Sequence, residues 1–149
     1  MITLPTSISI LAEIESTTIS GGSLRKFVME RLSQLPNYHW TGDYCLEGDE
    51  LVLDEYVGDH TDHTRIAVGQ GVCGTAVAEN ANQVIVDVRE LTNYLSCSAK
   101  TRSEIVVLIK DGQRILGQID VDGHEVGAFD RTDEEFLEKI AALLAQRWQ

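Results

Sequence analysis

The hydrophobic pattern of this chain alternates along two pairs of segments, and a tight turn joins the members of each pair. The turns lie at Gly48-Asp49 and Asp111-Gly112, and the segments that they join are 38–47 with 50–57 and 104–110 with 114–121. Alternating segments separated by a short Gly/Asp turn are typical of β-hairpins. Two hairpins of this kind predict an antiparallel sheet at the centre of the fold.

Helix-like spacing of apolar residues flanks these hairpins. Residues 6–17 carry apolar positions three and four apart, and Ser23 is placed to cap a second helix over 24–35. Thr132 is placed to cap a last helix over 133–148, whose acidic first turn suits the helix dipole. The order of helices, hairpins and a final helix predicts an α+β fold with helices packed on an antiparallel sheet.

Two of the three cysteines lie between the hairpins. Cys73 lies in a glycine-rich turn that runs into a short helix over 75–80, and the positive end of a helix dipole lowers a thiol pKa. A brief buried strand is expected at 84–86, followed by a long loop over 89–101 that contains Cys97. Cationic residues follow Cys97 and favour a thiolate, and a loop of this length in a compact domain is typical of a functional segment.

Length and composition narrow the function further. A chain of 149 residues suits one domain over 1–149, and a net charge of −12 argues against binding to nucleic acid. The chain has no run of the ~20 apolar residues that a membrane span needs, and its first residues lack the features of a signal peptide, so we expect a cytoplasmic protein. Three cysteines in a reducing compartment do not make a structural disulfide framework, which favours redox or nucleophilic use.

The sequence matches neither a nucleotide-hydrolysing site nor a common metal site. The glycine-rich turn lacks the Gly-Lys-Ser/Thr ending of a phosphate-binding loop. His60, His63, Cys73 and Cys97 offer zinc-type ligands, but their spacing matches no common zinc site. We therefore expect no metal.

Several motifs are shared with one family of small-molecule-binding domains. They are W-x-G-x-Y at 40–44, the glycine turn at 69–74, the apolar strand at 84–88 and G-Q-I-D-V-D at 117–122. With these features the chain resembles a GAF domain. It is also similar to a narrower group, the free methionine-(R)-sulfoxide reductases, through these segments: G-V-C-G-T-A at 71–76, the Cys97 loop, R-S-E-I-V-V at 102–107 and I-D-V-D at 119–122.

The resemblance implies a GAF-like, six-stranded antiparallel sheet sandwiched by helices, with the substrate in an enclosed pocket. It implies an oxidoreductase without a bound cofactor, which reduces free L-methionine-(R)-sulfoxide through a cysteine sulfenic acid and a disulfide. A thioredoxin-like reductant would restore the thiols, and homodimers are common in this group. A different class of function stays open, namely a non-catalytic GAF domain that binds or senses a small molecule.

The resemblance also assigns roles to individual residues: Cys97 as nucleophile, Cys73 as resolving thiol, Glu104, Asp120 and Asp122 as pocket carboxylates, and Trp40 and Tyr44 as an aromatic wall. The chemistry of these residues is compatible with the assigned roles. Carboxylates hold the ammonium group of an amino acid, and Asp120 and Asp122 share one face of a strand. Simpler roles remain open for several of these residues. Glu104 suits a surface acid or a partner of Arg102, and the two aromatic residues suit a core.

One position departs from the family pattern. His63 stands where these reductases usually have a third cysteine, ten residues before Cys73. Recycling would then use a direct disulfide between Cys73 and Cys97, or an external thiol. Cys45 lies in the middle of a strand, and we expect it to be a packing residue.

Overall fold

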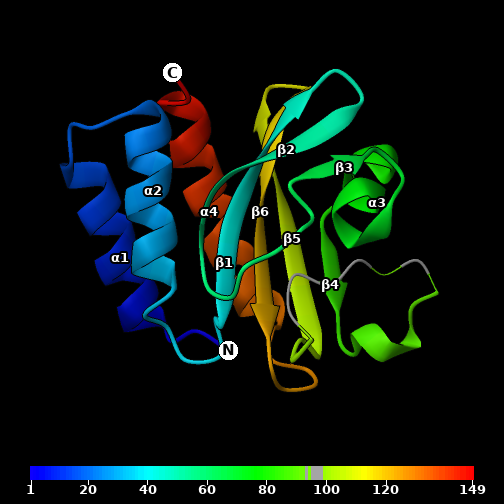
Figure 1. Ribbon diagram of the computed structural model, residues 1–149. Helices are drawn as coiled ribbons and strands as arrows, with labels where there is room; N and C mark the ends of the chain where they lie inside the picture. The colour runs from blue at the N-terminus through cyan, green and yellow to red at the C-terminus, as the bar shows by residue number, and fades with distance from the viewer. Residues whose placement is uncertain (93, 95–98) are drawn as a thin grey trace.

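The computed structural model describes residues 1–92, 94 and 99–149 (Figure 1). The helices are α1 (Leu4–Ser16), α2 (Gly21–Leu32), α3 (Gly71–Glu79) and α4 (Arg131–Gln146), with a 3-10 turn, η1, at Val88–Glu90. The strands are β1 (Trp40–Glu47), β2 (Glu50–Val57), β3 (Arg65–Ala67), β4 (Gln83–Ile85), β5 (Ser103–Asp111) and β6 (Arg114–Gly123). Both predicted hairpins are confirmed, and so is the α+β class.

The six strands form one antiparallel sheet in the order β3-β2-β1-β6-β5-β4. The pairing of β1 with β6 joins the two hairpins at the centre of the sheet. In this register Trp40 lies opposite Asp122, and Tyr44 lies opposite Gln118. The W-x-G-x-Y and I-D-V-D segments are therefore neighbours, although about eighty positions separate them in the chain.

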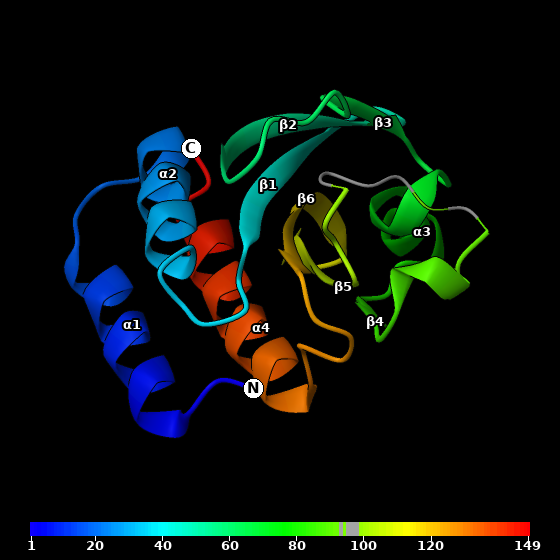
Figure 2. The same cartoon turned by 60° about the horizontal axis from the view of Figure 1, so that its bottom comes forward.

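Helices cover both faces of the sheet, as expected. Figure 2 shows α1, α2 and α4 on one side and α3 on the other, where the sheet curves around it. The residues of β5 contact both helical layers. Ile105, Val107 and Ile109 pack with α1, α2 and α4. Val106 and Leu108 point to the other face and pack with residues of α3. The strict alternation along one strand thus serves two apolar layers.

Two predicted helix caps are wrong. Helix α2 begins at Gly21, with Ser20 and not Ser23 at its N-cap position, and the Gly21 N–H donates to the Arg147 carbonyl. Helix α4 is capped by Asp130 instead of Thr132. The Asp130 carboxylate accepts from two backbone N–H groups, and the Asp133 side chain bonds back to the Asp130 N–H in a capping box.

The strand predicted to be buried at 84–86 is the edge strand β4. Its only neighbour in the sheet, among the described residues, is β5, and Val84 is 36% exposed. A short run of β-branched residues suits a buried strand and an edge strand equally. The local sequence could therefore not show which of the two this strand would be. Among the helices in the described parts of the chain, none is long and apolar enough to cross a membrane.

Candidate functional site

Three acidic side chains lie together on the face of the sheet that α3 covers. Glu104 on β5 lies opposite Asp122 on β6 in the strand register. Asp120 is two positions before Asp122 on β6 and shares its face. Their exposed fractions are 2% for Glu104, 0% for Asp120 and 1% for Asp122. Because three carboxylates buried together repel one another and are costly to ionise, such a cluster is suited to a proton, a cation or a cationic ligand.

The simpler interpretation of Glu104 as a surface acid is wrong, since its side chain is buried. Arg102 does not pair with Glu104 and donates instead to the carbonyls of Ala99 and Thr101. Burial, followed by repulsion from Asp120, raises the pKa of Asp122 well above its usual range. The Asp122 carboxyl therefore holds a proton at a pH where an exposed aspartate has lost it.

Cys73 lies in the first turn of α3, directly over this cluster. The helix begins at Gly71, so the cysteine belongs to the helix and not to the preceding turn as predicted. Its Sγ lies 3.9 Å from Oε2 of Glu104, and its carbonyl accepts a 3.0 Å hydrogen bond from the Gln118 amide. Gly74 lets the segment 67–69 pack against the helix, because a Cβ there would lie 2.5 Å from the Ala67 carbonyl oxygen.

Trp40 is held in place at the end of the acidic cluster. Its indole Nε1 donates to the Asp59 carbonyl at 3.0 Å, and its ring stacks on Tyr56. The ring lies against two glycines, since a Cβ on Gly42 would approach it to 2.4 Å and one on Gly58 to 2.6 Å. These contacts hold the indole in one orientation on the α3 face.

Tyr44 shares the apolar layer of Trp40 and is fully buried. Its hydroxyl donates to the His63 carbonyl at 2.9 Å and so ties β1 to the loop before β3. The geometry suits an aromatic wall beside the acids. The rings of Trp40 and Tyr44 also pack in the apolar layer under α3. The role of core residues, which the sequence left open, therefore fits them equally well.

Other residues named from the sequence lie elsewhere. Cys97 lies outside the described residues. His60 pairs with Asp62 on an exposed loop, and no group of described residues with metal-ligand geometry includes a histidine. Cys45 is a half-buried free thiol whose pKa is raised to about 12, first by burial and then by nearby aspartates.

The sequence interpretation missed two polar residues at the cluster. Gln118 holds the Cys73 carbonyl, and the Thr101 hydroxyl donates to Asp122 Oδ2 at 3.4 Å. Gln118 was detectable in principle, because it stands two positions before Asp120 and shares its face. Thr101 had no such signal, since its contact depends on how the chain enters β5.

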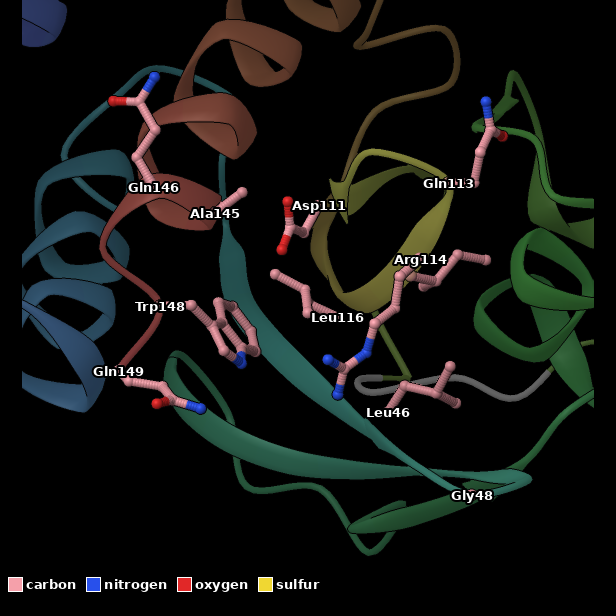
Figure 3. Close-up of a pocket in the computed structure, with 11 residues that line it drawn as sticks. Leu46, Gly48, Asp111, Gln113, Arg114, Leu116, Ala145, Gln146, Trp148 and Gln149 are labelled. Carbon is pink, nitrogen blue, oxygen red and sulfur yellow. The ribbon is translucent and has the colours of Figure 1, made fainter.

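A separate groove of about 740 Å³ lies between the end of α4 and the turns of both hairpins. Figure 3 shows Trp148 and Arg114 facing it from opposite sides. No residue of the acidic cluster lines it, so the groove is separate from the candidate site.

The sequence model of the GAF domain family matches residues 26–148. The chain belongs to the GAF domain family. The expected family is thereby confirmed, and the match covers every residue of the acidic cluster and its aromatic neighbours.

Relatives of this GAF domain include free methionine-R-sulfoxide reductases. The Escherichia coli enzyme is 40% identical over 111 residues, which are 74% of this chain and 67% of the relative. The solved structure of the Neisseria meningitidis enzyme with its substrate is 31% identical with a TM-score of 0.86, over 95% of this chain and 85% of the other. That of reduced fRMsr from Staphylococcus aureus is 32% identical with a TM-score of 0.84, over 100% of both chains.

Proposed function

We propose that this GAF domain is an oxidoreductase that reduces free L-methionine-(R)-sulfoxide. The observation that carries the proposal is the buried cluster of Glu104, Asp120 and Asp122 beside the Cys73 thiol. Relatives that bear the name of this activity support it, as does the likeness to a reductase structure that contains its substrate.

The cluster suits both ends of this substrate. Ionised carboxylates bind the ammonium group of a free amino acid through charge-assisted hydrogen bonds. A carboxyl that keeps its proton, as the raised pKa of Asp122 implies, is able to donate it to the sulfoxide oxygen and make the sulfur a better electrophile. The neighbouring indole of Trp40 offers an apolar surface to the methylthio end.

The proposed nucleophile is Cys97, which lies outside the described residues. Its thiolate attacks the protonated sulfoxide sulfur, the S–O bond breaks, and the oxygen passes to the cysteine, so that methionine leaves and a sulfenic acid remains. The Cys73 thiol then displaces that oxygen as water and forms a disulfide. A thioredoxin-type dithiol takes up the oxidising equivalent and restores both thiols. Because His63 stands in place of a third cysteine, recycling uses this direct disulfide or an external thiol.

The test is consumption of free L-methionine-(R)-sulfoxide with dithiothreitol as reductant. We expect turnover by the wild type and by Cys45→Ser, whose thiol lies outside the cluster. Cys97→Ser should be inactive, while Cys73→Ser should release one methionine per chain and then recycle slowly. The S epimer should not react. If the wild type shows neither turnover nor stoichiometric methionine release, the enzyme proposal fails.

A second candidate function is a ligand-binding or sensory GAF domain that lacks turnover. His63 favours it, because it replaces a thiol of the usual recycling set. Binding of methionine sulfoxide, measured by calorimetry and without consumption of the ligand, would select this alternative.

We further propose that residues 1–149 act as a single cytoplasmic domain. We also propose that this domain forms a homodimer, and sedimentation analysis would test the dimer.

A further inference from the structure

The acidic cluster also has the composition of a metal site. One ligand atom from each of Cys73, Glu104 and Asp120 lies within 4.8 Å of the other two, and all three residues are buried. They come from α3, β5 and β6, so three elements of the fold converge on one point. The sequence did not indicate this set, because its candidate ligands were two histidines and two cysteines.

A neighbouring buried oxygen points independently to a cation. Asp122 Oδ2 accepts a hydrogen bond from Thr101, whereas its Oδ1 is buried and has no hydrogen-bond partner among the described residues. Asp122 lies opposite Glu104 in the sheet and on the same face as Asp120. A buried carboxylate oxygen without a partner in the described part of the chain thus lies beside the three ligand residues, where a nearby cation would compensate its charge.

We propose that the reduced protein binds one Zn²⁺ through Cys73, Glu104 and Asp120, with a water molecule as fourth ligand. A thiolate and carboxylates together favour zinc over magnesium or calcium. Tetrahedral zinc with ordinary bond lengths places sulfur and oxygen about 3.6 Å apart. The observed 3.9 Å between Cys73 Sγ and Glu104 Oε2 needs only a small contraction. Zinc displaces the thiol proton, which leaves to solvent.

A second group in the fold provides a matched control. One ligand atom from each of Asp43, Cys45 and Asp54 also lies within 4.8 Å of the other two, on the opposite face of β1. There the Arg25 guanidinium already forms ion pairs with both carboxylates, at 2.6 Å from Asp54 and 3.4 Å from Asp43. A fixed cation repels a metal ion, so this group should remain without metal.

Zinc and substrate should exclude one another. The ammonium group and the metal would use the same carboxylates, so zinc should act as a competitive inhibitor. This competition rests on the proposed function, whereas metal binding does not. Zinc would thus hold the reduced site closed to substrate until a chelator or a competing protein removes it.

The experiment is titration of the reduced full chain with Co²⁺, followed by displacement with Zn²⁺. We expect one cobalt per chain and a thiolate-to-cobalt charge-transfer band, which Zn²⁺ removes and Mg²⁺ does not. Glu104→Gln should weaken binding at least tenfold, and Cys73→Ser should abolish the band. Cys45→Ser should leave both unchanged. Circular dichroism establishes that each variant is folded.

Three results would overturn the proposal: no stoichiometric cobalt binding by the wild type, a band that persists in folded Cys73→Ser, or a band that only Cys45→Ser removes. Turnover measured in the presence of a chelator tests the reductase separately. A cobalt band without turnover would refute the reductase alone, and turnover without metal binding would refute the zinc site alone.

Discussion

At the scale of single residues, the orientation of Trp40 depends on two positions that have no side chain. Gly42 and Gly58 leave room for the indole ring, and neither had been named as a site residue. Gly42 belongs to the W-x-G-x-Y segment, and its close contact with the ring gives this pattern a physical reason. A methyl group there would have to displace the ring or bend β1.

We therefore expect Gly42→Ala to impair the site more than the fold. Overpacking of this kind typically costs about 1–3 kcal/mol, and displacement of the indole should raise the KM for methionine sulfoxide several-fold. Steady-state kinetics and chemical denaturation measure the two effects. Gly22→Ala in α2 is the control, because its Cβ would meet only the end of the Arg25 side chain at 3.8 Å. An unchanged KM in Gly42→Ala would contradict the role given to Trp40.

At the scale of elements, a buried polar cluster joins α2 to the first hairpin. Asp43 lies at a bulge in β1, where its Oδ1 accepts from the Glu55 N–H of β2 at 3.1 Å. Burial, followed by hydrogen bonding and repulsion involving Asp54, raises the pKa of Asp43 to about 9. Arg25 opposes the shift but lies closer to Asp54 than to Asp43. The raised pKa therefore predicts that the buried Asp43 carboxyl is protonated at neutral pH.

This raised pKa predicts a pH dependence of stability. The unfolded chain loses the Asp43 proton near pH 4 and the folded chain near pH 9, so the folded state binds more protons between these values. The free energy of unfolding should therefore fall as the pH rises through this window, by up to about 1.4 kcal/mol per pH unit from this group. Asp43→Asn should remove that slope in denaturation curves recorded from pH 5 to 9.

The exposed Asp111 provides the control, because Asp111→Asn should leave the slope unchanged. Equal slopes for Asp43→Asn and the wild type would mean that Asp43 is already ionised in the folded protein. In that case the ion pair with Arg25, and not the proton, holds the cluster together.

At the scale of the whole molecule, the sheet separates a structural layer from a layer that contains the candidate site. Ile105 and Val106 are adjacent on β5 and fully buried, yet they pack on opposite faces. Val106 lies opposite Asp120 in the register, whereas Ile105 contacts the layer of α1, α2 and α4. Neighbouring substitutions should therefore differ in their consequences.

We expect Ile105→Val to lower the free energy of unfolding by about 0.5–1.5 kcal/mol with little change in KM. Val106→Ala should also destabilise the fold, but it should raise KM because it leaves space beside Asp120. Denaturation and steady-state kinetics on both variants separate the two layers. A larger change of KM in Ile105→Val than in Val106→Ala would contradict this division.

Local sequence was sufficient for the hairpins, for the helices and for the shared face of Asp120 and Asp122, because periodicity and turn chemistry act over a few residues. The resemblance to reductases supplied most of the site residues, and the role of Cys97 stays a prediction. The cap of α4 was misplaced by two positions because Asp130 and Thr132 are both good capping residues.

Only the tertiary structure decided that β1 pairs with β6, that β4 forms an edge of the sheet, and that burial beside Asp54 raises the pKa of Asp43. It also brought Cys73 to two carboxylates instead of two histidines. The physical reason is that strand order and burial follow from packing both faces of the sheet at once. That packing joins residues far apart in the chain, and no local pattern records which of them will meet.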